Sequence, residues 1–201
     1  MYGNVRLTIR VLIGVSAALS GCALAIALGQ AKESAAAGTA GALQDGAKLV
    51  RGYRSWARVN PTPVQMQPAA SALCIPPSPD QEPSPHLRKY VTVYVSALGK
   101  EAMLRQAKPQ FPAGTVIVKE KLARAGSKTP ELLTAMVKRT AGYAPGSGDW
   151  EYLTLDGSGA RVTARGNLET CRSCHARPPA LLSDHVFRAY YMTDSQRSAL
   201  K

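Results

Sequence analysis

The stretch YVTVYV, residues Tyr90–Val95, decides the fold class, because every position is β-branched or aromatic. Such side chains pack well on the pleated surface of a sheet and favour a strand. A second run, Thr115–Glu120, has the same character and follows a turn at residues 111–114 (FPAG). The stretch Asp149–Leu155 alternates between polar and apolar residues, and the turn DGSG joins it to Ala160–Ala164 as a hairpin. These runs predict an antiparallel sheet.

The segments around these strands predict a few helices. Residues Ala97–Lys108 are expected to be helical, as are Asp45–Val59, where apolar residues recur every three or four positions, and Ser183–Tyr191 near the C-terminus. Periodicity allows either a helix or a strand for Leu132–Lys138, and its place between two turn-rich segments favours a strand. Residues 144–148 (APGSG) predict a loop. The expected fold class is α+β, an antiparallel β-sheet with a few packed helices.

The motif Cys171-Arg172-Ser173-Cys174-His175 has the Cys-x-x-Cys-His form that attaches c-type haem. Each thiol can add across one haem vinyl group, and the histidine then supplies an axial nitrogen to the iron. The alternatives are a disulfide, a redox dithiol or half of a zinc site, but a zinc site needs four ligands and beyond this motif only His185 remains. We expect one covalently attached haem c, held by Cys171 and Cys174 on a short helix, with His175 as the iron ligand.

The N-terminus predicts export. Two arginines precede an apolar run, Val11–Leu28, and no acidic residue occurs before Glu33. Residues 1–31 are therefore interpreted as an export signal with three alternative fates. Cys22 becomes lipidated as in a lipoprotein, the run stays as a membrane anchor, or the signal is cleaved near residues 27–31. The expected location is periplasmic or otherwise extracytoplasmic, with membrane attachment at the N-terminus in the first two cases.

Composition divides the rest of the chain. Residues 32–46 are rich in alanine and glycine and predict a tether, and residues 47–192 form the predicted haem domain. Within it, residues 61–85 hold most of the prolines and include Cys74, to which no role is assigned. Residues 193–201 are interpreted as a C-terminal tail.

The chain is basic, with a formal net charge of +12 at pH 7. The basic residues are scattered rather than gathered with aromatic residues in a stripe, which does not favour nucleic-acid binding. A basic surface suits acidic redox partner proteins or anionic lipid headgroups.

Several stretches resemble the cytochrome P-460 family, whose members include the cytochromes c′-beta. They run in the family's order over roughly residues 48–190: residues 53–56 (YRSW), 90–95, 111–120 (FPAGTVIVKE), 148–152 (GDWEY), 171–175 (CRSCH) and 184–187 (DHVF). The haem motif alone is unspecific. The block at residues 111–120 together with a haem motif near the C-terminus is much more specific.

The resemblance implies an antiparallel β-fold around one five-coordinate haem c, with His175 proximal and an open distal face. In cytochrome P-460 itself, the lysine that matches Lys119 is bonded to the haem ring, and that bond accompanies hydroxylamine oxidation. In the c′-beta relatives the bond is absent, and the open face binds small gases such as nitric oxide. Residue chemistry alone would make Lys119 a solvent-facing charge, paired with Glu120 or with nothing. The resemblance also implies that a homodimer is one oligomeric state to expect.

One departure from the family bears on mechanism. The hydroxylamine-oxidising members carry a glutamate shortly after the haem motif, whereas here residues 176–180 (ARPPA) hold no carboxylate and the first one is Asp184. Arg177 cannot act as a general base and would instead favour bound anions. Arg177 and Asp184 are candidate polar groups near the haem, and Phe111 and Phe187 are candidate aromatic neighbours.

Three functions follow. The first is redox or small-ligand chemistry, with a diatomic or nitrogenous ligand, at the open iron of an exported mono-haem c cytochrome. The second is an oxidoreductase that oxidises hydroxylamine through a haem bonded to Lys119. The third is a six-coordinate electron carrier, which needs a sixth ligand. The candidates for that ligand are Met66, Met103, Met136, Met192, His86 and His185.

Overall fold

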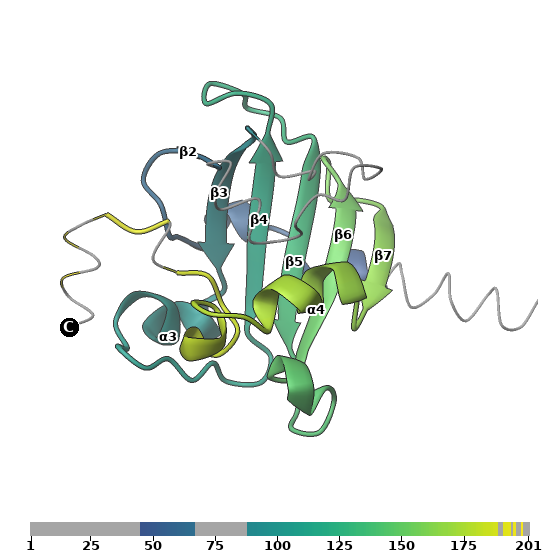
Figure 1. Ribbon diagram of the computed structural model, residues 1–201. Coiled ribbons are helices and arrows are strands. Elements are labelled where there is room, and N and C mark those ends of the chain that lie inside the picture. The colour runs from purple at the N-terminus through teal and green to yellow at the C-terminus, as the bar shows by residue number, and fades with distance from the viewer. Residues whose placement is uncertain (1–44, 67–87, 189–190, 194, 196–197, 199–201) are drawn as a thin grey trace, which may run out of the picture. The chain divides into compact units, whose positions relative to one another are not determined.

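The computed structural model describes residues 45–66, 88–188, 191–193, 195 and 198 (Figure 1). The predicted export signal with Cys22, the tether up to residue 44, Cys74 and His86 lie outside these residues. Within the described part of the chain, no helix is both long and apolar enough to cross a membrane.

The described residues form an antiparallel sheet of seven strands. The order is β1-β3-β4-β5-β6-β7, and β2 also pairs with β3. The strands are β1 (Ala57–Arg58), β2 (Val64–Gln65), β3 (Tyr90–Val95), β4 (Val116–Leu122), β5 (Leu132–Lys138), β6 (Trp150–Asp156) and β7 (Val162–Gly166). The antiparallel sheet with a few helices is confirmed. Strands β3 and β5 have the predicted bounds, and the other three predicted strands lie one or two residues from theirs.

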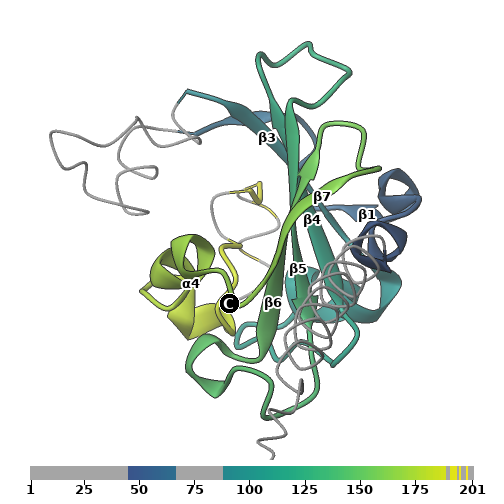
Figure 2. The ribbon, with the colours of Figure 1, turned by 90° about the vertical axis from the view of Figure 1, so that its right-hand side faces the viewer.

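The sheet has two buried faces because successive side chains of a strand point to opposite sides. One face carries the helix α4 (Glu169–His175), and we call it the α4 face. Its core includes alternate valines of β3 together with Ile117, Met136, Trp150 and Tyr152. Figure 2 shows α4 on one side of the sheet and the segment at residues 45–56 on the other.

The opposite face is covered by the segment at residues 45–56. Val50 and Tyr53 pack there on a cluster that includes Val118, Leu133 and Leu153. The single helix expected over residues 45–59 is wrong. Residues 45–49 are helical, Gly52 takes a left-handed conformation with φ 70°, and a short 3₁₀ helix η1 (Tyr53–Ser55) follows before β1. A residue in the left-handed conformation ends an α-helix, so the chain changes direction at Gly52. The apolar residues after Gly52 keep the three- and four-residue spacing but do not belong to the same helix.

The helix expected over residues 97–108 is shorter than predicted. It consists of a 3₁₀ turn η2 (Ala97–Gly99) and α3 (Lys100–Leu104). Arg188, which is buried, donates hydrogen bonds to the carbonyl oxygens of Ala102 and Gln106 at 2.8 and 2.7 Å. The carbonyl of Ala102 is one that the end of α3 leaves without a helical partner, and that of Gln106 lies just beyond the helix, so Arg188 stabilises the end of α3.

The helix expected over residues 183–191 is wrong where the structure describes it. A 3₁₀ turn η4 (Leu181–Ser183) ends at Asp184 and His185, whose φ values of 50° and 63° lie in the left-handed region. Both side chains have fixed polar partners that hold the chain in this irregular path. In the predicted loop at residues 144–148, a 3₁₀ turn η3 (Pro145–Ser147) forms.

Candidate haem site

The predicted haem motif lies on α4, a short helix as expected. Glu169 in the first turn suits the positive end of the helix and forms an ion pair with Arg172. Cys174 is buried, Cys171 is half-buried, and both are thiols rather than a disulfide. Residues three apart lie on the same face of a helix, so the geometry presents both sulfurs on one side.

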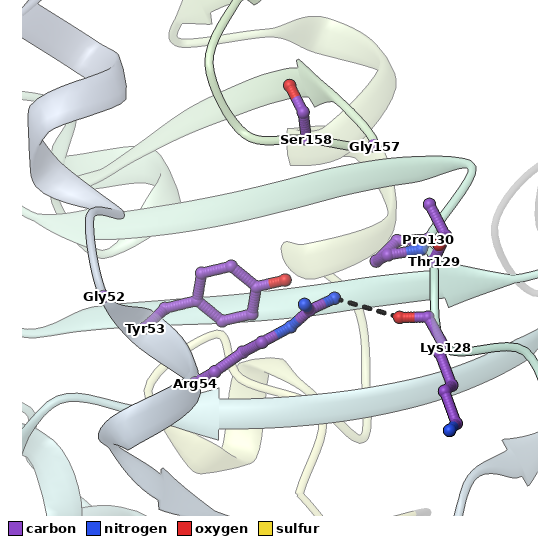
Figure 3. Close-up of a pocket in the computed structure, with 8 residues that line it drawn as sticks. All are labelled: Gly52, Tyr53, Arg54, Lys128, Thr129, Pro130, Gly157 and Ser158. Carbon is purple, nitrogen blue, oxygen red and sulfur yellow. Dashed lines mark hydrogen bonds between the residues drawn. The ribbon is translucent and has the colours of Figure 1, made fainter.

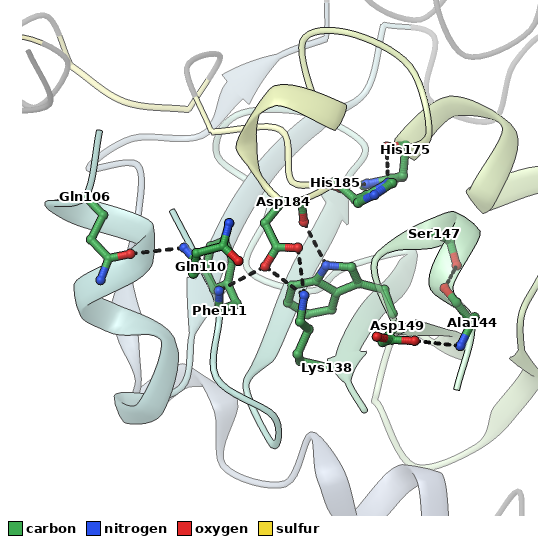
Figure 4. A network of polar contacts seen from close by, with 11 residues as sticks. Gln106, Gln110, Phe111, Lys138, Ala144, Ser147, Asp149, His175, Asp184 and His185 are labelled. Carbon is green, nitrogen blue, oxygen red and sulfur yellow. Dashed lines mark hydrogen bonds and ion pairs between the residues drawn. The ribbon is translucent and has the colours of Figure 1, made fainter. Parts of the chain in front are cut away.

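His175, the last residue of α4, is held by a reciprocal pair of hydrogen bonds with His185 (Figure 4). The Nδ1 atom of His175 lies 2.7 Å from the carbonyl oxygen of His185, and the Nδ1 atom of His185 lies 3.1 Å from that of His175. A carbonyl oxygen only accepts, so both Nδ1 atoms carry the proton. The Nε2 atom of His175 therefore keeps its lone pair, as a metal ligand requires.

The charge state of His175 fits the same role. Burial lowers the pKa of His175 to about 4, and the positive charge of Lys119 adds to this shift. The hydrogen bond to His185 opposes it without cancelling it. The imidazole is therefore neutral at neutral pH, which is the state that binds iron.

Two aromatic rings and one glycine fix the histidine pair. The ring of Tyr152 on β6 lies 5.4 Å from that of His175, and the ring of Phe187 lies 5.0 Å from it. On the other side, a Cβ atom at Gly148 would come within 2.4 Å of the Cδ2 atom of His185. Only glycine leaves room for the His185 ring at this position.

The hydroxyl group of Tyr152 is a buried polar atom with no hydrogen-bond partner among the described residues. Burial, and to a lesser degree the neighbouring thiols of Cys171 and Cys174, raise the pKa of Tyr152 above its usual value. A buried hydroxyl without a partner costs free energy, which a polar group bound beside the thiols could offset. Two thiols on one helix face, an imidazole with Nε2 available and this hydroxyl fit a covalently held haem.

Comparison with known proteins decides the family. The chain matches the family Cytochrome P460 over residues 50–188. It belongs to the cytochrome P460 family. The suspected resemblance is therefore confirmed, and the family implies a cytochrome with a haem cofactor. A comparison with curated proteins finds no match.

In this P460-family chain, Asp184 fastens the segment after α4 to the sheet (Figure 4). Its carboxylate accepts a 2.7 Å hydrogen bond from the Lys138 ammonium and one of 2.9 Å from the backbone N–H of Phe111. Its carbonyl oxygen accepts a 2.8 Å bond from the indole N–H of Trp150. Asp184 adjoins His185 along the chain and so supports the histidine pair, while its own carboxylate is already engaged.

The other predicted site residues divide into two groups. Phe187 lies against His175, whereas Phe111 packs on Trp150, with ring centroids 5.4 Å apart. Arg177 is exposed, and its backbone N–H donates to the carbonyl oxygen of Cys174 at 3.1 Å. Phe187 thus contacts the predicted iron ligand, whereas Arg177 lies at the C-terminal end of α4.

Lys119 lies on the α4 face, the same face as the haem motif. Its register partners, Val93 on β3 and Thr134 on β5, share that face, and its charge acts on His175. Glu120 points to the opposite face, where it accepts hydrogen bonds from Tyr53 at 2.6 Å and Arg54 at 2.8 Å. Lys119 and Glu120 therefore lie on opposite faces of the sheet, which argues against the ion pair between them that residue chemistry alone allowed.

A separate pocket of about 270 Å³ lies near η1 (Figure 3). It is lined by Gly52, Tyr53, Arg54, Lys128, Thr129, Pro130, Gly157 and Ser158. None of these residues belongs to the haem motif. The polar ends of Tyr53 and Arg54 are already bound by Glu120, so the pocket has no part in the site described above.

Several contacts of the site escaped sequence reasoning. The alternation of Trp150 and Tyr152 along β6 does predict that they share a face, which is the signal that could have placed Tyr152 beside the motif. No local signal pairs Lys138 with Asp184, which is 46 residues away, or Gly148 with His185.

Proposed function

We propose that the chain is an exported mono-haem c cytochrome that carries out redox or small-ligand chemistry at an open iron. Cys171 and Cys174 hold the haem and His175 binds the iron, which would take a diatomic or small nitrogenous ligand such as nitric oxide. The observation that carries the proposal is the histidine pair, which leaves one neutral imidazole nitrogen available beside two thiols. The apolar N-terminal run supports export to the periplasm or another extracytoplasmic site.

The chain's own residues have distinct tasks in this proposal. Cys171 and Cys174 would each hold the haem by one thioether bond, in which the sulfur bonds one vinyl carbon and the thiol proton goes to the other, so that no oxidant is needed. The carbonyl oxygen of His185 holds the Nδ1 proton of His175 and thereby fixes the tautomer and the basicity of Nε2. Tyr152 and Phe187 exclude water from the sides of the imidazole. The haem iron would supply the redox and ligand-binding chemistry.

Mass analysis and the visible spectrum test this function together. We expect the denatured protein to keep the mass of one haem, and the Cys171→Ser, Cys174→Ser double variant to lose it. We also expect a high-spin ferrous spectrum that changes when nitric oxide is added. A wild-type chain from which acid-acetone extracts the haem would contradict the thioether assignment. Sharp low-spin bands in both oxidation states would instead show a sixth protein ligand and favour electron transfer.

A second candidate function, hydroxylamine oxidation, rests on the position of Lys119. It lies on the α4 face and its charge acts on His175, which supports Lys119 as the candidate for a bond to the haem ring. A strongly red-shifted reduced Soret band that disappears in Lys119→Ala, together with reduction by hydroxylamine, would favour this function. The first function fits better because the carboxylate of Asp184, the first one after the haem motif, is already bound to the Lys138 ammonium and the backbone N–H of Phe111.

A further inference from the structure

Lys121 is a buried lysine that the site described above does not use. It lies on β4 two residues after Lys119, and its register partners are Val91 on β3 and Leu132 on β5. Only 4% of its surface is exposed. Since side chains two apart on a strand share a face, Lys119 and Lys121 both lie on the α4 face.

The charges around Lys121 do not balance. Burial, and then the charges of Lys119 and Lys89, lower the pKa of Lys121 to about 8, and among the described residues only Glu131 opposes this shift. Glu131 is itself bound to Lys89, with a nitrogen–oxygen distance of 2.6 Å. Burying an ammonium group is costly unless an anion accompanies it. The described part of this region therefore has more positive than negative charge.

The position of Lys121 relative to the haem motif is informative. Cys171 packs on the α4 face, near Tyr152 on β6. Tyr152 pairs with Met136 on β5, and Met136 pairs with Ile117 on β4, so the three residues form one row across the sheet. Two strand spacings, about 10 Å, separate β6 from β4, and Lys121 lies about 13 Å beyond Ile117 along the strand. The propionates of a haem are on the edge opposite its vinyl groups. A haem bonded to Cys171 and Cys174 by its vinyl groups would thus direct its carboxylates away from α4.

We propose that Lys121, with Lys119 beside it, binds the propionate carboxylates of the haem. The inference rests on the proposed function, because it requires a haem bonded to Cys171 and Cys174. A propionate carboxylate would supply the anion that burying the Lys121 ammonium requires and would offset the cost of that burial. A free small anion has the same chemistry, and the experiment below separates it from a propionate.

The test compares holoproteins that carry Lys121→Met, Lys121→Arg or, as a control, Lys128→Met. Lys128 is exposed and lies between β4 and β5, so its replacement removes the same charge without a buried contact. We expect the propionate bending bands of the resonance Raman spectrum to shift in Lys121→Met and to return toward the wild-type position in Lys121→Arg. We also expect Lys121→Met to lower the midpoint reduction potential more than Lys128→Met does, because a nearby cation disfavours the ferric state.

Three outcomes would overturn the inference or its basis. Unchanged propionate bands with unchanged azide affinity of the ferric protein would show that Lys121 contacts no anion. Unchanged bands with weaker azide binding would assign Lys121 to a free anion at the iron. A denatured chain without the mass of haem would contradict the proposed function itself, whereas a haem-bearing chain with unchanged bands contradicts this inference alone.

Discussion

At the scale of single residues, the site depends on Gly148 as much as on the histidines it supports. The His185 ring occupies the space that a Cβ atom at Gly148 would need, and His185 in turn fixes the tautomer of His175. Because interiors are close-packed, a methyl group here cannot be absorbed without moving the ring. The precise direction of the predicted iron ligand is therefore set by a residue that makes no hydrogen bond to it.

Gly148→Ala should weaken both the fold and the iron–histidine bond. Gly52 has a similar left-handed conformation, with φ 70° against 62°, but nothing lies near the position of its Cβ. Gly52→Ala should cost about 1 kcal/mol for backbone strain alone, and Gly148→Ala about 1 to 3 kcal/mol more because of the His185 contact. Thermal unfolding of the holoproteins and the ferrous iron–histidine stretching band check this. Equal effects of the two variants would show that the contact is unimportant.

Tyr53 should make the fold less stable at high pH. Burial, and then the hydrogen bond to Glu120, raise the pKa of Tyr53 well above its usual value of 10. As the pH rises above 10, the unfolded chain loses this proton while the folded chain keeps it, so the stability falls. Tyr53→Phe removes the hydrogen bond to Glu120 and should lower the free energy of unfolding at neutral pH by about 1.5 to 3 kcal/mol. Because phenylalanine has no proton to lose, the variant should lose less stability than wild type above pH 10. Urea unfolding at several pH values measures this, and parallel pH slopes would contradict it.

At the scale of elements, the sequence predicted the strands well and the helices poorly. The strand at residues 90–95 was predictable because every side chain is β-branched or aromatic. The pattern at residues 132–138 also allowed a helix, and only the turn-rich segments on either side favoured the strand that forms there. The C-terminal segment was not predictable, because its path depends on Asp184 and His185 meeting Lys138 and His175, and neither contact is visible in local periodicity. The haem motif and its short helix were readable from spacing, whereas Tyr152 and the histidine pair required the sheet and α4 to be placed together.

Asp184→Asn should loosen the segment that supports the histidine pair. The Lys138 side chain is only 13% exposed, and the variant would leave its charge without the carboxylate at 2.7 Å. Removing one partner of a buried pair typically costs about 3 to 5 kcal/mol. Thermal unfolding should show this loss, and hydrogen exchange at Phe111 and His185 should become faster. The exposed pair of Asp45 and Lys48 serves as the control, and Asp45→Asn should cause no measurable change. A small effect at Asp184 equal to that control would mean that the pair does not hold the segment.

At the scale of the whole described unit, two cores share one sheet but depend on different partners. The face opposite α4 is closed by the chain's own residues 45–56 and contains the Glu120 network with Tyr53 and Arg54. The α4 face contains the haem motif, the orphaned Tyr152 hydroxyl and the buried Lys121. The buried Tyr152 hydroxyl without a partner among the described residues and the buried Lys121 thus share the face where the proposed haem would bind.

The double variant Cys171→Ala, Cys174→Ala, which cannot hold haem covalently, should therefore unfold locally rather than globally. A helix of seven residues is too short to be stable without tertiary contacts, so the segment at residues 168–188 should lose protection from hydrogen exchange first. Residues 45–56 and the centres of β4 and β5 should keep theirs, because the core of the opposite face is formed by the chain alone. Hydrogen exchange followed by mass spectrometry of the variant and the holoprotein measures both regions. A uniform loss of protection on the two faces would show that haem attachment and the whole sheet form one cooperative unit.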